Sequence, residues 1–569
     1  AICLSGDFNP DEMVCIIEKY FGQMQPNKDL PELKFETKSM IDSVVEKEVY
    51  GLEAENIMIG WKYPGAGTRD AMIAEIASSI LYNGSAGLID LNVNQKQTTL
   101  GAFGMPYTRP DAGEFILMGN PKAGQTLEEV RDILIAETEK LRNGDFDEAL
   151  LTGTINNLKL NMMNLLENNS GRADLYVQSF INGTDWKDEV AYIDNMSKVT
   201  KADVVEWAGK YLGNNNCAIV YKRQGEDKSV QKVSAPKITP IKSNRDAQSG
   251  FLAEIQNTEV APIEPVFVDY DKDMSRFQAE GLDVLYAENK LNDIAFISYA
   301  FDAGTETDPA LNLAFDYLSY LGTDKMSAEE IAEKMYQLAC SFRLRAGSLS
   351  TGITVSGLSE NLETAMDIVE ELVYNAVPDE QILANLKSDM LKSRNDAKLS
   401  QSSCFNALQR YVMYGPEYIR KTTLTDEQIK AITSEELLSK IRDLVSHRHE
   451  VLYYGPATKE EVSALIKEHH KVAEDLKTLE KKYPVLRKTD ANKVYLAQYD
   501  AKQIYYLQYS NRGERLDLEA EPMLTMYNEY FGGGMNAIVF QEMREARGLA
   551  YSANARLYNP SHKDDSYMY

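Results

Sequence analysis

The stretch from Tyr530 to Arg556 reads YFGGGMNAIVFQEMREARGLAYSANAR, and we interpret the rest of the chain as a scaffold for it. A helix is expected to end at the three consecutive glycines 532–534, because residues without a Cβ allow positive φ and close backbone approach. Asn536 can then cap a new helix, which Gly548 ends. A strand is expected to follow this turn.

Arg544 lies near the end of this predicted helix, and Tyr551 lies at the start of the expected strand, so a tight turn would bring a guanidinium and a phenol together. The run of glycines followed by FQEMREARGLAYS resembles the second-half module of the insulinase/pitrilysin family of zinc metallopeptidases. The resemblance implies that Arg544 and Tyr551 contact the substrate backbone and its oxyanion beside the metal. An Arg and a Tyr at this spacing would mean little alone in a chain with 33 Tyr; the surrounding residues carry the resemblance.

Composition narrows the classes of partner. A chain of 569 residues suggests about four domains. Its net charge of −27 argues against a nucleic-acid backbone or an anionic membrane surface, and favours neutral or basic ligands. The five cysteines show no CxxC spacing, so neither a zinc ribbon nor a disulfide framework is indicated. No apolar run approaches the roughly 18 residues of a membrane span.

Internal repeats indicate duplication. Residues 1–8 are expected to form a short strand, and residues 6–17 align without a gap on residues 455–466, each with a capped helix and its apolar stripe. Residues 200–221 align on residues 433–454, each a capped helix followed by a strand. Strand-like runs that lead into long helices begin at Ile57, Ile294 and Ile504. These mutually consistent sets favour duplication over the chance likeness of helix–strand segments.

The repeats predict an α+β protein with tandem homologous domains, each an antiparallel-rich sheet packed with long helices. We expect the tail of a first domain at 1–30, a second domain at 45–225, a third at 268–480 and the first part of a fourth at 485–569. Residues 226–267, which are rich in polar residues and proline, are expected to form a linker. The resemblance implies two bowl-like halves of two domains each, joined by this linker, with peptide enclosed between them.

The metal site of the resembled family is the inverted motif HxxEH, in which two His bind Zn2+ and the Glu is the general base. The repeat places its equivalents in the third domain at Leu313, Asp316 and Tyr317. Leucine cannot bind zinc, so we expect this copy to be metal-free. The zinc-binding copy is expected upstream of Ala1, and we expect the chain to be truncated at both ends.

None of the five histidines completes the motif. His447 and His449 flank an arginine, but no His follows at the required spacing, and the group is interpreted as solvated. His469 and His470 are adjacent and would point about 100° apart on a helix, so they are not expected to share a metal. His562 stands alone.

Two functions remain open. In the first, the chain is most of a zinc endopeptidase and supplies the substrate-binding half but not the metal site, so that the fragment alone is inactive. In the second, the parent protein is a non-catalytic subunit or structural member of the same family. Peptide substrates, a family-type dimer and a periplasmic or cell-envelope location are implied by the resemblance, and the charge favours basic peptides.

Overall fold

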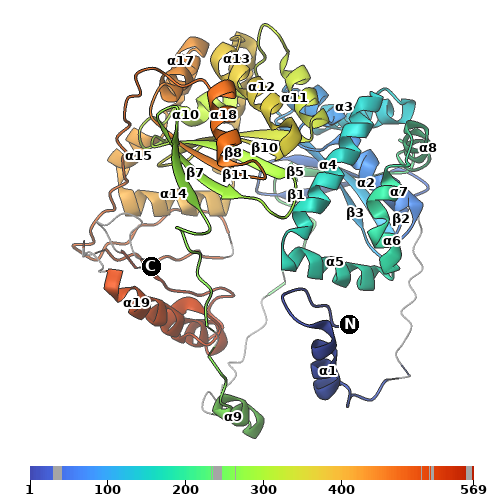
Figure 1. Ribbon diagram of the computed structural model, residues 1–569, viewed down its shortest axis with the longest axis vertical. Coiled ribbons are helices and arrows are strands. Elements are labelled where there is room, and N and C mark those ends of the chain that lie inside the picture. The colour runs from blue at the N-terminus through green and yellow to red at the C-terminus, as the bar shows by residue number, and fades with distance from the viewer. Residues whose placement is uncertain are drawn as a thin grey trace.

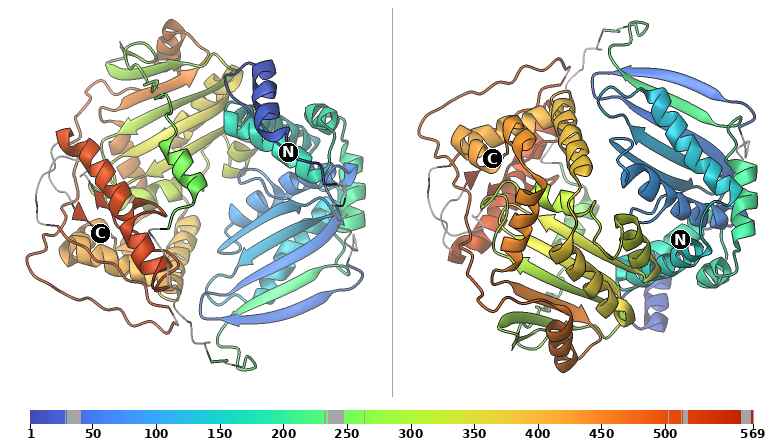
Figure 2. Two further views of the ribbon diagram at one scale, coloured as in Figure 1. Left: turned by 90° about the horizontal axis from the view of Figure 1, so that it is seen from below. Right: turned by 90° about the horizontal axis from the view of Figure 1, so that it is seen from above.

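The structure contains two sheets, each packed with long helices (Figure 1). Most of the buried hydrophobic residues belong to the two cores that these sheets form with their helices. The computed structural model describes residues 1–27, 29, 41–231, 233–234, 247–262, 264–501, 503–511, 513, 518–558 and 567–568. Figure 2 shows the two sheets side by side, one from the earlier and one from the later part of the chain. The predicted α+β class with tandem antiparallel-rich sheets is confirmed.

The first sheet unit, residues 45–224, is built on five strands in the order β1-β5-β2-β4-β3. These are β1 (Val45–Gly51), β2 (Asn56–Pro64), β3 (Gly101–Thr108), β4 (Ala112–Asn120) and β5 (Ala218–Gln224). In β2 every second residue from Ile57 to Tyr63 is buried, because successive side chains of a strand point to opposite faces and one face lies on the core.

Helices cover this sheet, and most of them begin at a residue whose side chain caps the helix. They are α2 (Arg69–Leu81), the π-helical turn η1 (Asp90–Asn94), α3 (Leu127–Asn143), α4 (Glu148–Leu166), α5 (Asn169–Asn182), α6 (Trp186–Val190), α7 (Tyr192–Met196) and α8 (Lys201–Tyr211). Thr126 and Thr200 start α3 and α8 with capping boxes, in which the side chains of Thr and of the third helical residue each bind the other's backbone N–H. The caps fix where these helices begin.

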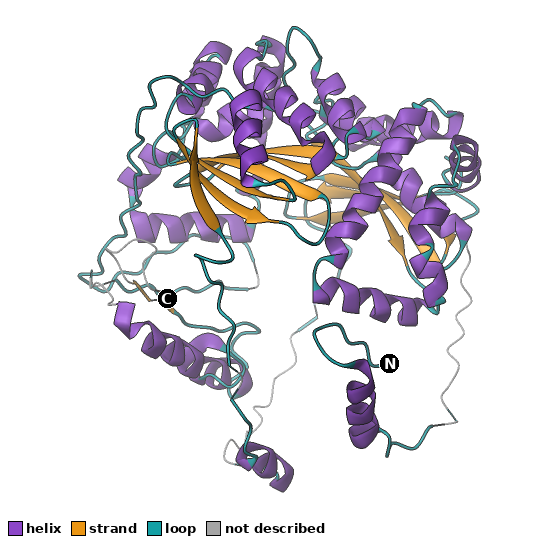
Figure 3. Cartoon of the chain, in the orientation of Figure 1, coloured by secondary structure: helices purple, strands orange, loops and turns teal. Residues whose placement is uncertain are grey.

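The second sheet unit, residues 275–469, has six strands in the order β6-β7-β11-β8-β10-β9. These are β6 (Ser275–Ala279), β7 (Leu282–Glu288), β8 (Ile294–Phe301), β9 (Cys340–Ala346), β10 (Thr351–Leu358) and β11 (Glu450–Gly455). Its helices are α10 (Leu311–Leu318), α11 (Ala328–Gln337), η2 (Ser359–Asn361), α12 (Leu362–Asn375), α13 (Glu380–Ala397), α14 (Gln401–Tyr414), α15 (Pro416–Thr422), α16 (Asp426–Ala431), α17 (Ser434–Val445) and α18 (Lys459–His469). In the view of Figure 3, helices lie over one face of the sheet.

The two sheets share one topology once β6 is set aside. The order β1-β5-β2-β4-β3 corresponds strand by strand to β7-β11-β8-β10-β9, and the pairs β1–β5 and β7–β11 are both parallel. The helices before β5 and β11 both begin with capping boxes, at Thr200 and Thr433, which the sequence repeat aligns. The strand runs from Ile57 and Ile294 are β2 and β8. The duplication inferred from the repeats is therefore confirmed for these two units.

Residues 1–27 differ from the expectation at one point. Asn9 caps helix α1 (Pro10–Phe21) as predicted, but residues 1–8 are loop and bend, not a strand. A strand needs a neighbour to satisfy its backbone groups, and these residues have none in the described part of the chain. Helix α1 buries none of its residues, whereas its repeat equivalent α18 buries Val462 and Ile466 against the second sheet unit.

The predicted linker joins the two sheet units. Its residues 232, 235–246 and 263 lie outside the described residues. The described remainder consists of turns, bends and loop apart from a short helix, α9 (Gly250–Asn257), which the sequence analysis did not predict. Ser249 caps this helix, and its apolar residues, Phe251 among them, are exposed.

Between α18 and residue 513, the described residues form no helix and no strand longer than an isolated bridge. The strand expected from Ile504 is wrong: residues 503–509 have no assigned secondary structure beyond one bend, because no neighbouring strand lies beside them among the described residues. Then follow η3 (Leu518–Ala520), α19 (Glu521–Asn528), η4 (Glu529–Gly533), α20 (Ile538–Phe540), η5 (Gln541–Glu545), β12 (Leu557–Tyr558) and β13 (Tyr567–Met568).

Candidate functional site

The three glycines let two chain segments meet closely, as the sequence analysis expected. Helix α19 passes into the π-helical turn η4, and Gly532 in this turn is buried against the backbone of Ala555. An added Cβ on Gly532 would lie 2.1 Å from the Ala555 carbonyl oxygen. The Asn528 side chain then donates to the Leu557 carbonyl (3.0 Å) and accepts from the Leu557 N–H (2.8 Å). These contacts fix the segment that follows Tyr551.

A short helix made of α20 and η5 positions Arg544. Its N-cap is Ala537 and not the expected Asn536, and no side chain caps it. Gly548 ends it as predicted, with a φ of 58° that favours glycine. The N–H of Gly548 donates to the Arg544 carbonyl at 2.9 Å, and the chain reverses there.

The reversal brings Arg544 and Tyr551 together. The guanidinium carbon of Arg544 lies 4.7 Å from the ring centre of Tyr551 and 4.8 Å from that of Phe540, one turn earlier. Both distances are within the range of cation–π contacts. The sequence predicted the meeting of the guanidinium and the phenol but missed Phe540, although the spacing of four residues to Arg544 was the available signal. The predicted strand at Tyr551 is wrong, since strand structure begins only at Leu557.

Both polar groups are accessible to a ligand. Tyr551 is 87% exposed, and the Arg544 side chain is 33% exposed. The two aromatic rings contact the guanidinium through cation–π attraction, and ring carbons do not take the place of a carbonyl or carboxylate acceptor for its N–H donors. The Glu545 carboxylate lies 3.6 Å from Arg544 Nε, which is close enough for an ion pair but beyond the distance of a hydrogen bond. The pair can therefore offer hydrogen-bond donors to a carbonyl or carboxylate.

The three positions of the degenerate metal motif lie on α10 in the second sheet unit. Leu313 and Tyr317 are buried, at 1% and 0% exposure. The Tyr317 hydroxyl accepts from the Asp379 N–H at 2.8 Å and lies 3.0 Å from Ser434 Oγ. Asp316 is accessible and accepts from Asn312 at 3.0 Å, and partial desolvation raises the pKa of its carboxyl.

These side chains do not fit a zinc ion. Leu313 has no donor atom, and the Tyr317 oxygen is already held by a backbone N–H and a hydroxyl. Asp316 alone cannot supply the three or four ligands that zinc takes. Within the residues that the structure describes, no three His, Cys, Asp or Glu side chains are grouped so that they could hold a metal.

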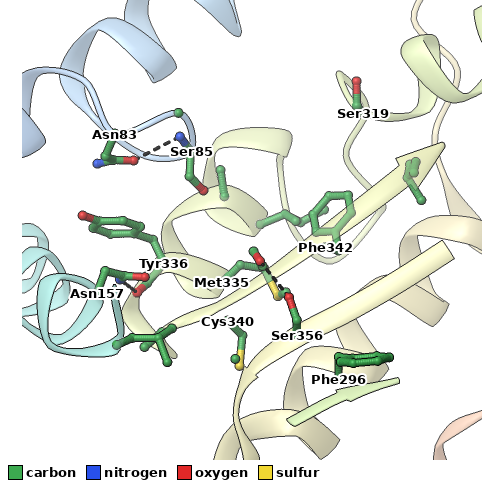
Figure 4. Close-up of a pocket in the computed structure, with 18 of the residues that line it drawn as sticks. Asn83, Ser85, Asn157, Phe296, Ser319, Met335, Tyr336, Cys340, Phe342 and Ser356 are labelled. Atoms are coloured by element: carbon green, nitrogen blue, oxygen red, sulfur yellow. Dashed lines mark hydrogen bonds between the residues drawn. The ribbon is translucent and has the colours of Figure 1, made fainter. Parts of the chain in front are cut away.

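A cavity of about 770 Å³ lies between the two sheet units. Figure 4 shows Asn83 and Asn157 on one side and Phe342 and Ser356 on the other, with Tyr336 beside Asn157. The polar groups of its wall are mostly amides and hydroxyls, which suit the binding of peptide-like groups rather than acid–base chemistry.

Cys340 also lines this cavity, but it is not an activated nucleophile. Burial raises the pKa of its thiol to about 11, so the thiol stays protonated at neutral pH. Asp316 is the one carboxylate in the described wall. The cavity therefore lacks the paired groups that general acid–base catalysis requires.

The predicted solvation of His447 and His449 is wrong for His449. His449 is 4% exposed, and its Nε2 lies 2.8 Å from Nε2 of His470. His470 Nδ1 in turn contacts the Glu370 carboxylate at 2.5 Å. Burial lowers the pKa of His449 to about 4. The period-2 pattern of β11 was the available signal, because it places His449 in phase with the buried Val451.

The neighbouring histidines behave differently. His469 Nδ1 lies 2.8 Å from Asp367 Oδ1 near the surface, so His469 and His470 point at different partners, as their predicted divergence implies. His447 Nδ1 contacts the Asp443 carbonyl oxygen at 2.6 Å. His562 lies outside the described residues.

Comparison with known proteins identifies the family. A sequence profile described as the peptidase M16 inactive domain matches residues 1–158 and 431–569, together more than half of the chain. The chain belongs to the peptidase M16 family. The predicted membership of the insulinase/pitrilysin family of zinc metallopeptidases is thereby confirmed.

The curated M16 relatives are longer than the matched part. An uncharacterized zinc protease of Mycobacterium leprae is 24% identical over 249 residues, which are 42% of this chain and 55% of that protein. The zinc protease PqqE of Helicobacter pylori is 24% identical over 234 residues, which are 39% of this chain and 50% of that protein. The chain spans about half the length of the curated relatives that it matches.

Solved structures are similar at low identity. The periplasmic protease PqqL of Escherichia coli has a TM-score of 0.42 and 16% identity, over 99% of this chain and 65% of that chain. The peptidase M16 inactive domain from Pseudomonas fluorescens has a TM-score of 0.41 and 17% identity, over 52% of this chain and 73% of that chain. In the described part of the chain, every helix is too short or too polar to cross a membrane.

Proposed function

We propose that this chain is the substrate-binding part of a zinc-dependent endopeptidase that encloses and hydrolyses peptides. The stacked and accessible pair Arg544 and Tyr551 is the observation that carries the proposal. Zinc and the general base would come from residues outside this chain, because Leu313, Asp316 and Tyr317 do not fit a zinc ion. The chain alone would then be inactive.

Each member of the pair has a separate role in this proposal. Tyr551 donates its hydroxyl proton to the scissile carbonyl and to the oxyanion that develops from it, and a donor placed there lowers the barrier. Arg544 binds a peptide carbonyl or carboxylate with its N–H donors. Phe540 and Tyr551 both contact the guanidinium and help to hold it in place.

The rest of the chain would form the enclosure. The two sheet units would be the second and third domains of a four-domain peptidase, with residues 226–267 as the linker between its bowl-like halves. Residues 1–30 and 485–569 would belong to the first and fourth domains. The unburied apolar stripe of α1 supports this, since the equivalent stripe of α18 packs into a domain core.

The proposal extends to the charge of the substrate and to the cell compartment. The net charge of −27 favours cationic peptides, whose association should slow as salt is added. A periplasmic or cell-envelope location and a family-type dimer are proposed from the family resemblance.

The test uses the full-length peptidase and matched variants. Tyr551→Phe should lower the turnover number roughly 10²- to 10³-fold and change peptide affinity much less, because the lost hydrogen bond strengthens in the transition state. Tyr530→Phe is the control, since Tyr530 is an exposed tyrosine of the same segment with no assigned role. Equal turnover in the two variants would refute a catalytic role for Tyr551.

Arg544 has a matched control on the same turn. Arg544→Lys keeps the charge but loses the planar fork, so it should impair peptide binding and turnover. Arg547→Lys should leave both unchanged, because Arg547 is paired with Glu542. If both lysine variants behave like the parent, or if the parent lacks peptidase activity, the chain is better described as a non-catalytic member of the family.

The metal assignment is tested separately on this chain alone. After extensive dialysis, elemental analysis should find no stoichiometric zinc, because Leu313 and the hydrogen-bonded Tyr317 occupy the motif positions. One tightly bound zinc per chain would overturn the alignment of the motif on α10.

A further inference from the structure

A buried chain of three titratable side chains joins three elements of the second sheet unit. Glu370 lies on α12, His470 caps the end of α18, and His449 directly precedes β11. All three residues are at most 8% exposed. The links are 2.5 Å from Glu370 Oε1 to His470 Nδ1 and 2.8 Å from His470 Nε2 to His449 Nε2. His449 Nδ1 completes the chain at 2.8 Å from the His447 carbonyl oxygen.

The positions of the protons along these hydrogen-bonded side chains follow from the last acceptor, the His447 carbonyl oxygen. A backbone carbonyl can only accept, so His449 must carry its proton on Nδ1. Neutral His449 then has a bare Nε2, which accepts a hydrogen bond from the Nε2–H of His470. His470 Nδ1 and the Glu370 carboxyl share one further proton. The hydrogen bond between the two imidazoles therefore runs from His470 to His449.

A second proton on His449 would break this arrangement. Two N–H groups would then face each other across 2.8 Å, and a charge would be placed in a buried site. Around His449, Phe301 is apolar, and Tyr374 and Glu370 of α12 are bonded to Lys471 and His470. The ring of Tyr299 of β8 lies in a T-shaped contact with His449, and its hydroxyl is buried without a hydrogen-bond partner in the described part of the chain. Burial accordingly lowers the pKa of His449 to about 4.

The same cluster holds the segment that leaves the second sheet unit. The Lys471 N–H donates to the second oxygen of Glu370 at 3.2 Å, and the Lys471 carbonyl accepts from the Tyr374 hydroxyl at 3.0 Å. Further along, the Arg448 N–H donates to the Lys477 carbonyl at 2.8 Å. Residues 470–479 are thus attached to α12 and to the approach to β11, and the chain continues from there towards α19 and Arg544.

We propose that Glu370, His470 and His449 form a proton-sensitive latch that holds residues 470–479 on the second sheet unit and releases them when His449 is protonated. The proposed latch does not depend on peptidase activity, so it can be tested independently of the proposed function. Its consequence is that mild acid frees the segment leading to the last part of the chain while the two sheets stay folded.

Hydrogen exchange read by mass spectrometry tests the latch in the intact protein. If release requires protonation of His449, with pKa values near 4 when held and near 6.5 when free, the protection factor of residues 470–479 should fall on the order of 10- to 100-fold between pH 7.5 and pH 4.5. Strand β2 in the first sheet unit is the internal reference and should keep its protection. No loss at residues 470–479, or an equal loss in β2, would overturn the proposal.

Two histidine variants separate the latch from general acid effects. His449→Gln keeps a donor and an acceptor at this position but cannot titrate, so the pH dependence at residues 470–479 should shrink to less than about threefold. His469→Gln removes the neighbouring exposed pair with Asp367 and should retain the full dependence. Unchanged pH dependence in His449→Gln would refute the latch.

A measurement on the unmodified protein covers the case in which His449→Gln fails to fold. In NMR spectra of protein labelled with 13C at histidine, the Cε1–H signal of His449 should not titrate above pH 5. The signal is assigned by its proximity to Phe301, whose ring centre lies 4.6 Å from that of His449. Titration of this signal with a midpoint above pH 6 would overturn the proposal.

Discussion

Gly532→Ala should displace the segment that carries Tyr551. The added Cβ would lie 2.1 Å from the Ala555 carbonyl oxygen, and also within 2.8 Å of the backbone nitrogen and carbonyl carbon of the same residue. Ordinary contacts begin at about 3.4 Å, so the two segments must separate by more than about 1 Å. Backbone atoms cannot rotate away as a side chain can.

The loss of docking free energy in Gly532→Ala is estimated from the contacts that this separation breaks. The two hydrogen bonds between Asn528 and Leu557 lie two residues beyond the clash, at 2.8 and 3.0 Å, and would be lost at about 1 kcal/mol each. Overpacking adds about 1–3 kcal/mol. The docking of residues 550–557 should therefore weaken by about 3–5 kcal/mol.

The assay compares Gly532→Ala with Gly534→Ala, a control from the same run of glycines. A Cβ on Gly534 would meet its nearest atom only at 3.9 Å, and its φ of −142° suits any residue. Gly532→Ala should raise hydrogen exchange in residues 549–558 and, in the full-length peptidase, lower turnover about 10²-fold, because a substrate-contacting group is misplaced by about 1 Å. Identical exchange and turnover in the two variants would refute the close approach.

Three further outcomes are expected in this chain. Tyr317→Phe should lower the free energy of unfolding in urea by about 1–3 kcal/mol, because it leaves the partly buried Asp379 N–H without its acceptor; no change would mean that water replaces the hydroxyl. Lys122→Ala should make the junction of the sheet units easier to cleave by protease, since the 2.9 Å pair with Asp389 bridges them, and the swap Lys122→Asp with Asp389→Lys should restore resistance. The free energy of unfolding should fall by up to about 3 kcal/mol between pH 6.5 and pH 4, because the unfolded chain protonates His449 first; a flat profile would contradict the depressed pKa.

Local sequence patterns correctly predicted those features of the structure that depend only on residues close together in the sequence. The caps at Thr200 and Thr433, the buried alternation that begins at Ile57 and the end of a helix at Gly548 all depend on a few neighbouring residues. Each is encoded by hydrogen bonding or backbone freedom within one or two turns. The repeat then extended these local predictions to a shared sheet topology.

The sequence predictions failed where the structure of a segment depends on a partner that is distant in the sequence. Residues 1–8 and 504–509 have the composition of strands, but a strand also needs a neighbour, and composition does not show whether one is present. The contact between His449 and His470 joins residues 21 positions apart through the packing of α18 against β11 and α12. Hydrophobic periodicity could place His449 on the buried face but could not name His470 as its partner.

The junction between the sheet units includes hydrogen bonds to backbone acceptors as well as side-chain pairs such as Lys122 with Asp389. Gln95 donates to the Tyr320 carbonyl at 3.1 Å, and Asn157 donates to the Tyr336 carbonyl at 2.8 Å. These carbonyls lie at the ends of α10 and α11, where a helix leaves its last carbonyls without intrahelical partners. Substitution of either tyrosine leaves the acceptor in place, whereas substitution of Gln95 or Asn157 removes the donor. Sequence drift at these two contacts is therefore constrained on one side only, whereas the pair Lys122 and Asp389 constrains both sides of the junction.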